Sequence, residues 1–249
     1  MGTVVTFHVE TSHLPEANVR EAIGDAVQMM HRHDDLFSTW KPESPMSRLR
    51  RGEVRLDDAP LEIAEVLELC TTARLLSGGW FDPFSMPGGI DPTGLVKGWS
   101  AEHALGILKE AGIGSAMVNA GGDIACLGAP SVGGRWKIGI RHPWRADALA
   151  CVLEVNAAIA TSGAYERGRH LVDPIGRRGP QPAAATVTGP SLAFADAFAT
   201  AVAIGGDEAF GIVASLDRYD AYLIRADGSE ASTEGICFVD TSLTSSPRP

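Results

Sequence analysis

The segment "SLAFADAFATAVAIGG", residues 191–206, constrains the fold more than any other part of the chain. Its length and composition predict a helix over 191–204 that is apolar on nearly every side, and such a helix is buried in a protein core. The rest of the chain must therefore supply elements that pack around it. A single carboxylate, Asp196, interrupts the apolar run.

Asp196 and Thr200 are four residues apart, so their side chains share one face of the expected helix. A buried carboxylate without a partner is costly, and this helix contains no Lys or Arg. A carboxylate with hydroxyl and carbonyl oxygens is a donor set that suits Mg²⁺. A backbone N–H from another element would satisfy Asp196 equally well, so both alternatives stay open at this point.

Shorter periodic segments predict the elements around this helix. The alternation in "TVVTFHV" predicts a strand. Further helices are expected from about Pro15, over 60–76, over 97–111 with Gly112 as its cap, and over 208–216. Further strands are expected at "SAMVNAGG", "WKIGIR", "ACVLEV", "AAIATSG" and "AATVTG", and Asp227-Gly228 predicts a hairpin. Without a linker-like change of composition, this predicts one α+β domain over 1–240 and a flexible tail over 241–249.

The composition limits the partners and the location. The formal net charge is −10, so a nucleic acid or an anionic membrane surface would repel the chain overall. The four cysteines form no CxxC pair, which predicts four reduced thiols and no zinc site. The start of the chain lacks the basic and apolar regions of a signal peptide, and no apolar stretch of roughly 18 residues is evident. We therefore expect a cytoplasmic protein with no membrane insertion.

The segment "GGWFDPFSMPGGIDPTGLVKGWSAEHAL" contains two Asp-Pro steps and several glycines before a helix. Asp-Pro favours turns, and glycine allows a ligand to approach the backbone closely. We expect Lys97-Gly98 to open the helix, where an ammonium group and backbone N–H groups would bind phosphate. The alternative is a purely structural turn.

Three other segments carry candidate residues, each with a structural alternative. In "VNAGGDIACLG" a strand ends in a bend that either packs against a ligand or is only a tight turn. Thr161 and Ser162 end another strand ahead of His170, which is either a functional or a structural histidine. Trp40, in a polar turn, either stacks on a heteroaromatic ring or pins a surface loop.

Taken in order, these segments resemble the ApbE-type FAD:protein FMN transferases over nearly the whole chain. The motifs that carry the resemblance are "MGT", "STWKPESPMSRL", "FDP", "GGIDPTGLVKGWSAEHA", "VNAGGDIACLG", "WKIGIRHP", "ATSGAYER…HLVDPIG" and "ADAFATAV". The chain departs from the family pattern at a few positions. Trp40 replaces a Tyr, Phe84 a Thr, Arg50 an Asn and Pro92 a Leu.

The resemblance implies a single T-fold-like α+β domain with two halves around a flavin cleft. It places FAD against Met1, Trp40, Asp82, Pro83, Phe84, Asp91, Lys97, Thr161, Ser162, His170 and Leu171. It places Mg²⁺ between Asp196, Thr200 and the backbone carbonyl of Gly94.

The implied reaction is the transfer of FMN from FAD to a Thr or Ser hydroxyl of an acceptor protein, with release of AMP. Mg²⁺ would offset charge on the pyrophosphate, and His170 or a carboxylate near the metal would accept the proton of the hydroxyl. Asp196 and His170 are the catalytic candidates. The alternatives are an FAD pyrophosphatase, in which water replaces the hydroxyl, and a non-catalytic FAD-binding protein.

Overall fold

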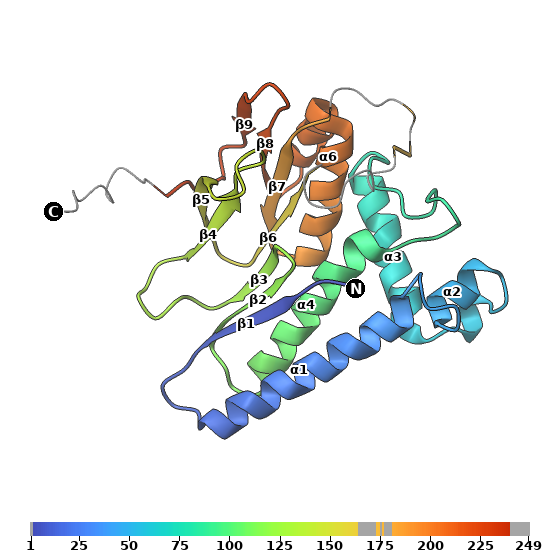
Figure 1. Cartoon of the computed structure of the whole chain (residues 1–249), viewed down its shortest axis with the longest axis horizontal. Helices are drawn as coiled ribbons and strands as arrows, with labels where there is room; N and C mark the ends of the chain where they lie inside the picture. The colour runs from blue at the N-terminus through green and yellow to red at the C-terminus, as the bar shows by residue number, and fades with distance from the viewer. Residues whose placement is uncertain (1, 164–172, 175, 177–180, 240–249) are drawn as a thin grey trace.

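The computed structural model describes residues 2–163, 173–174, 176 and 181–239. In this part of the chain one antiparallel sheet has the strand order β1-β2-β3-β6-β7-β8-β9 (Figure 1). Its strands are β1 (Val5–Glu10), β2 (Ser115–Ala120), β3 (Asp123–Leu127), β6 (Ala158–Ser162), β7 (Ala184–Gly189), β8 (Asp220–Ile224) and β9 (Glu230–Ser232). The N-terminal strand is thus an edge strand, and β3 and β6 meet in the middle.

Helices cover one face of this sheet. They are α1 (Glu16–Phe37), α2 (Pro45–Arg50), α3 (Leu61–Leu76), α4 (Thr93–Glu110) and α6 (Leu192–Ala214), with a 3-10 turn η1 at Leu56–Asp58. Both α4 and α6 pack on the strands, α1 packs on α4, and α3 lies against α4 and α6 (Figure 1). The expected α+β domain is confirmed, with its main core between the sheet and the helices.

A separate hairpin covers part of the opposite face. It consists of β4 (Trp136–Arg141) and β5 (Leu149–Val155), which pair with each other and not with the large sheet. The inward side chains of the hairpin, among them Trp136, Ile138 and Leu153, form a second core with Ile159 and Tyr222 of the sheet. The middle strands are therefore covered on both faces.

The helix α6 is as buried as its sequence predicts, and every residue from Ala195 to Ala199 has less than 9% of its surface exposed. The two helices expected over 191–204 and 208–216 are one element with a kink at Gly206, where φ is 55° and ψ is −134°. A glycine accepts this backbone conformation without steric cost. By length and composition alone α6 could cross a membrane, contrary to the expectation from sequence, yet it packs against α4, β6 and β7.

The close crossing of α4 and α6 depends on Gly98. A Cβ atom at this position would lie 2.5 Å from the Leu192 carbonyl oxygen and 2.9 Å from the Ala193 nitrogen. Only glycine lets the two helices approach this closely, and the approach sets residues of α4 beside the buried carboxylate of α6.

Several expectations need correction. The helix α4 begins at Thr93, not at Lys97, because Asp91 and Pro92 form its start and Asp91 accepts the Thr93 N–H. The polar segment after Trp40 is not only a turn, since Ser44 caps the short helix α2. The bend in "VNAGGDIACLG" joins two strands, and the second, β3, was not expected.

Other expectations are confirmed. All four cysteines are free thiols, and burial raises the pKa of Cys70 and Cys126 to about 12. Gly112 follows α4 with a φ of +84°, as expected of a cap, and Gly228 turns the β8–β9 hairpin with a φ of +85°. The expected tail over 241–249 lies outside the described residues.

Candidate functional site

The site is centred on one ammonium group between two buried carboxylates. Lys97 of α4 forms an ion pair with Asp123, and its Nζ lies 3.7 Å from Asp196 Oδ1. The side chains of Asp123 and Asp196 are 1% and 4% exposed, whereas that of Lys97 is 17% exposed. The sequence expectation that Asp196 lacks a basic partner within its helix is correct, but Lys97 reaches it from the neighbouring helix.

Each of these side chains is placed by a different local feature. Lys97 lies in the second turn of α4, next to the Gly98 crossing. Asp123 starts β3 directly after Gly121 and Gly122, whose φ angles of +66° and +105° turn the chain back from β2. The Gly122 N–H also donates to Asn119 Oδ1 at 2.8 Å, which fixes this turn.

Hydroxyl groups surround the charged centre. Asp123 Oδ1 accepts the Thr161 N–H at 3.1 Å, and Thr161 Oγ1 lies 2.9 Å from Thr186 Oγ1. Ser162 Oγ lies 3.3 Å from Thr200 Oγ1, one turn along α6 from Asp196. The structure therefore brings together Lys97, Thr161, Ser162, Asp196 and Thr200, as expected.

Gly94 lies at the same place. A Cβ atom built on Gly94 would meet Phe81 at 3.1 Å and Thr200 Oγ1 at 4.0 Å, so the backbone of α4 passes close to the Thr200 hydroxyl. A carboxylate, hydroxyls and backbone carbonyls are hard oxygen donors, which fit Mg²⁺. In the described ranges, no group of three or more His, Cys, Asp and Glu side chains that could hold a metal ion gathers.

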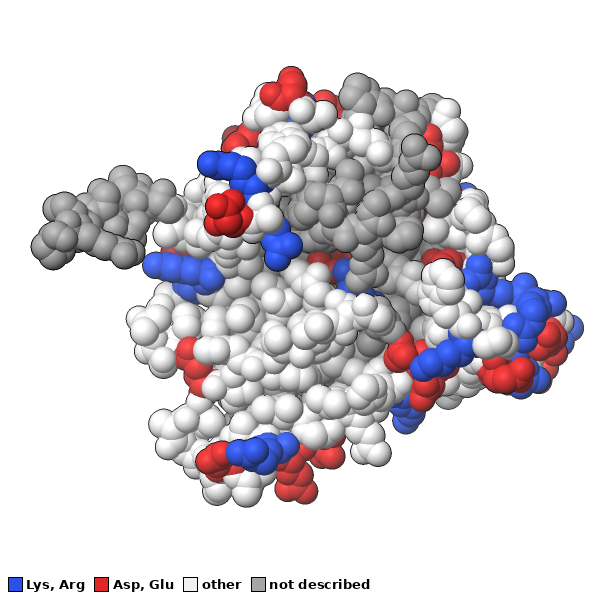
Figure 2. Space-filling view, viewed as in Figure 1, with Lys and Arg blue, Asp and Glu red and all other residues white. Residues whose placement is uncertain are grey.

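Two adjoining cavities lead away from this centre. One of about 180 Å³ is lined by Trp40, Thr93 and Lys97, and by residues at the end of α1. The other, of about 300 Å³, lies between β1 and α1 and shares Gly2 and Asp34 with the first. Trp40 is 91% exposed, so its ring is accessible at the mouth of the first cavity. Around this part of the surface, charges of both signs are interspersed over α2, while the face over β1–β3 is largely uncharged (Figure 2).

The loop that precedes α4 is held by its own aspartates. Asp82 Oδ2 accepts from Arg74 Nε at 2.8 Å and from Ser85 Oγ at 2.9 Å, and Asp82 Oδ1 accepts the Phe84 N–H at 3.0 Å. Burial raises the pKa of Asp82, but these hydrogen bonds outweigh it and leave the pKa below its usual value. The Asp82 carboxylate thus holds the loop, and its contact with FAD stays a prediction.

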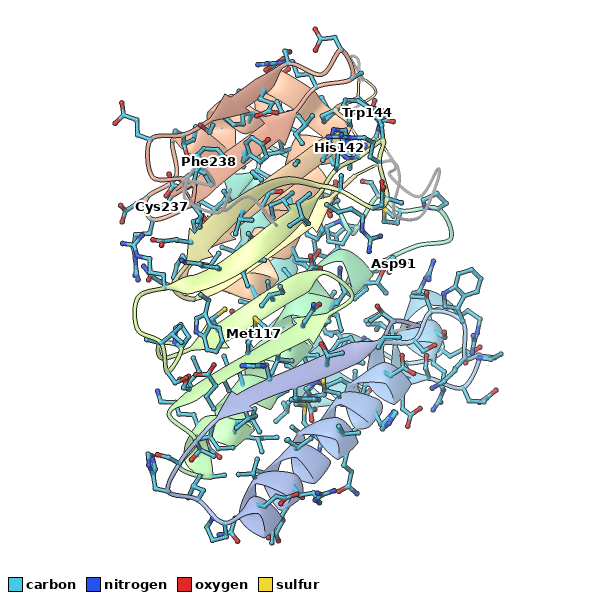
Figure 3. All side chains as sticks on the ribbon, turned by 60° about the vertical axis from the view of Figure 1, so that its left-hand side comes forward. Asp91, Met117, His142, Trp144, Cys237 and Phe238 are labelled. Atoms are coloured by element: carbon cyan, nitrogen blue, oxygen red, sulfur yellow. The ribbon has the colours of Figure 1, made fainter. Side chains whose placement is uncertain are left out.

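Asp91 stands at the start of α4 (Figure 3), where its N–H donates to the Pro83 carbonyl at 2.8 Å. The two Asp-Pro steps are therefore tied together. Arg50, which departs from the family pattern, donates to the carbonyls of Pro87 and Gly88, both at 3.1 Å. Arg50 therefore ties α2 to the loop that precedes α4.

Three predicted residues, Met1, His170 and Leu171, lie outside the described residues. Asp123, in contrast, is a central residue that the sequence interpretation missed. The available signal was an acidic residue directly after a Gly-Gly turn at the start of an apolar run. The position of Lys97 needs correction, because it lies in the second turn of α4 and not at its start. Its contact with the phosphates of FAD stays a prediction.

The sequence matches known proteins over most of its length. The sequence model of the ApbE family matches residues 1–89 and 84–223. An FAD:protein FMN transferase of Escherichia coli (strain K12) is 26% identical over 156 residues, which are 58% of this chain and 44% of that protein. One of Rhodobacter capsulatus is 33% identical over 159 residues, 58% of this chain and 29% of that protein. The match thus spans less than half of these relatives.

Solved structures show the same fold. The flavin transferase ApbE from Vibrio cholerae superimposes with a TM-score of 0.76 at 19% identity, over 94% of each chain. The ApbE protein from Thermotoga maritima gives a TM-score of 0.79 at 20% identity, again over 94% of each chain. Together with the family match over most of the sequence, this similarity leads to one conclusion: the chain belongs to the ApbE family.

Proposed function

We propose that this protein is an FAD:protein FMN transferase, which moves FMN from FAD to a Thr or Ser hydroxyl of an acceptor protein. The observation that carries the proposal is the set of Lys97, Thr200 and the buried carboxylates of Asp123 and Asp196, beside the cavity that Lys97 and Trp40 line. A flavin or adenine ring can stack on an exposed tryptophan. A pyrophosphate can bind to an ammonium group and to a metal ion that oxygen atoms hold nearby.

In the proposed reaction some groups bind FAD, and another group accepts the proton of the acceptor hydroxyl. The oxygen of the acceptor hydroxyl bonds to the FMN-side phosphorus, the phosphoanhydride bond breaks, and AMP leaves. In this proposal Lys97 binds the phosphates, and the hydroxyl proton goes to a base, for which His170 is our candidate. A low-dielectric site strengthens the attraction between the ammonium group and the phosphates.

Mg²⁺ belongs to the same proposal. Asp196, Thr200 and the Gly94 carbonyl would hold it, and the oxygen donors that lie together there support this assignment. When bound, the ion supplies positive charge that offsets the charge on the pyrophosphate.

Incubation with FAD, Mg²⁺ and candidate acceptor proteins tests the proposal. Intact-mass spectrometry of the acceptor should show an FMN adduct, and chromatography should show one AMP for each adduct. Asp196→Asn and addition of EDTA should both abolish the adduct. AMP and free FMN without an adduct would identify a pyrophosphatase instead, and absence of AMP with every acceptor would contradict both reactions.

A further inference from the structure

The motif "WKIGIRHP" forms most of a basic surface on the outer face of the β4–β5 hairpin. Arg135, Lys137 and Arg141 alternate with inward residues and are exposed, and Arg145 follows in the turn. The range 135–155 holds four basic and two acidic residues, a formal net charge of +2, whereas the whole chain carries −10. Figure 2 shows basic side chains over this hairpin, beside the largely uncharged face over β1–β3. The hairpin is therefore a basic surface on an acidic protein.

Three of these cations have no carboxylate partner. Within the described part of the chain, Lys137, Arg141 and Arg145 form no ion pair. Arginines elsewhere in the described ranges mostly pair with a carboxylate, as Arg20 does with Glu16. An exposed cation without an internal partner keeps its charge for another molecule, and such charges guide association and select the partner.

Exposed apolar side chains lie among these cations. Trp144 is 54% exposed in the turn, and Leu149 is 56% exposed at the start of β5. The Leu149 side chain lies across Gly139, where a Cβ atom would be 2.8 Å from Leu149 Cδ1. Tryptophan and arginine are the residues that most often dominate the binding energy of protein interfaces. This combination fits a protein surface better than a small anion.

Hydrogen bonds hold the turn that carries Trp144 and Arg145. The His142 N–H donates to the Ala148 carbonyl at 2.9 Å, and the Ala148 N–H donates to the Arg145 carbonyl at 3.1 Å. The Trp144 N–H donates to His142 Nδ1 at 3.2 Å. A partner that binds an ordered turn does not have to order it first, which lowers the entropic cost of binding.

The hairpin is also fixed to the strands that carry the candidate site. Its inward side chains share the second core with Ile124, the residue after Asp123, and with Ile159, two residues before Thr161. In Figure 3, His142 and Trp144 lie in the same half of the view as Asp91. A protein bound to the hairpin would thus be anchored on the elements that form the site.

We propose that the outer face of the β4–β5 hairpin docks an acidic surface of the acceptor protein. Lys137, Arg141 and Arg145 attract its carboxylates, and Trp144 supplies the apolar contact among them. The inference rests on the proposed function, because it states the chemistry of the protein that receives FMN. An anionic membrane is the other occupant to test, although the charge of −10 would repel it from the chain as a whole.

The first measurement follows the binding of fluorescein-labelled poly-L-glutamate by fluorescence anisotropy at low salt. It compares the wild type with a hairpin variant that combines Lys137→Gln, Arg141→Gln and Arg145→Gln. We expect the variant to bind on the order of tenfold more weakly, because each exposed charge contact contributes modestly and three are removed together.

A matched control removes the same amount of charge elsewhere. It combines Arg20→Gln, Arg48→Gln and Arg55→Gln, three exposed arginines that pair with neighbouring carboxylates. This control variant should bind poly-L-glutamate almost as the wild type does. An equal loss in the two variants would show that only the net charge matters and would overturn the docking surface.

The second measurement uses an acceptor that receives FMN in the transfer assay, with FAD at saturation. The hairpin variant and Trp144→Ala should each raise KM for the acceptor, by roughly tenfold. The kcat and the FAD dissociation constant should stay unchanged, because none of these side chains lines the cavity beside Lys97. KM of the wild type should rise with KCl concentration, and that of the hairpin variant should rise less.

The outcomes separate this inference from the proposed function. If an FMN adduct forms but neither the hairpin variant nor Trp144→Ala raises KM for the acceptor, the docking surface is wrong and the proposed function stands. Trp144→Ala alone decides this if the hairpin variant folds poorly. Loss of binding to phosphatidylglycerol vesicles, with KM for the acceptor unchanged, would identify a membrane contact instead and overturn the inference. Absence of an adduct with every acceptor would remove the proposed function and this inference together.

Discussion

The replacement Gly98→Ala tests how far the geometry of the site depends on the contact between α4 and α6. The added methyl carbon would lie 2.5 Å, 2.7 Å and 2.9 Å from three backbone atoms of Leu192 and Ala193. Ordinary contacts of such a carbon lie at 3.4–4 Å. Backbone atoms cannot rotate out of the way as a side chain can, so the two helices must move apart.

Two opposing terms set the magnitude. Alanine is favoured over glycine inside a helix by about 1 kcal/mol. Overpacking a close-packed core typically costs about 1–3 kcal/mol, and more where the neighbours cannot adjust. Because all three contacts are with backbone, we expect the clash to exceed the propensity gain and the free energy of unfolding to fall by about 1–2 kcal/mol. For a chain of this length that corresponds to a melting temperature lower by about 2–8 °C.

The same helix supplies the control. A Cβ atom on Gly106 would meet nothing within 4 Å, so Gly106→Ala should gain the propensity term alone and raise the unfolding free energy by up to about 1 kcal/mol. Urea unfolding followed by circular dichroism measures both variants. Equal stabilisation by the two replacements would refute the close crossing at Gly98. Gly98→Ala should also weaken Mn²⁺ binding, because it moves Gly94 of α4 away from the Thr200 hydroxyl of α6, whereas Gly106→Ala should not.

Three further predictions concern single side chains. Trp40→Ala should leave the unfolding free energy unchanged, because the ring is 91% exposed. It should weaken FAD binding by about 1–3 kcal/mol if flavin stacks as bases do on aromatic rings. An unchanged dissociation constant in fluorescence titration would exclude the stacking. Asp196→Ala should fold cooperatively and lose metal-dependent release of AMP, since alanine suits an apolar helix; wild-type turnover at limiting Mg²⁺ would show that the metal lies elsewhere. His33 is buried between α1 and α4, and burial, with the charges of His103 and Arg32, lowers its pKa to about 4. As the pH falls, the unfolded chain, with a histidine pKa of about 6.5, therefore takes up a proton before the folded protein does. The free energy of unfolding should fall by about 2 kcal/mol between pH 7 and pH 5, relative to that of the variant His33→Gln. Urea titrations in which the wild type and the variant differ by the same unfolding free energy at both pH values would contradict this.

Much of the fold could be predicted from local sequence patterns, because those patterns report which face of an element is buried. The apolar run around Asp196 predicts a core helix, and α6 is that helix. The start of α4 could not be placed in the same way. The Asp-Pro step predicts a turn, but the helix begins directly after Pro92, because proline is accepted just ahead of a first turn, where its missing N–H would have no partner in any case.

The part of the site that lies on one helix could be predicted from sequence, because helical spacing determines which side chains share a face. Spacing along one helix predicts that Asp196 and Thr200 share a face, and the hydrogen bond between Thr200 and Ser162 is consistent with that. The contact between Lys97 and Asp123 joins a helix to a strand on another side of the core, and no local pattern encodes it. Such contacts follow from how elements pack, which is why Asp123 was recognised only in the three-dimensional structure.

The junction between β3 and β6 contains a backbone hydrogen bond whose opening can be measured in solution. The register of these strands pairs Ile124 with Ile159 and Ala125 with Ala158, and the Cys126 N–H donates to the Ala157 carbonyl at 2.6 Å at one end. At the next place along the junction the Thr161 N–H donates to the carboxylate of Asp123 and not to a backbone carbonyl. Exchange of amide hydrogens for deuterium measures how often each such hydrogen bond opens. The exchange rate of the Thr161 amide hydrogen therefore reports movements of the Asp123 side chain. It does so from a single backbone position and needs no attached label.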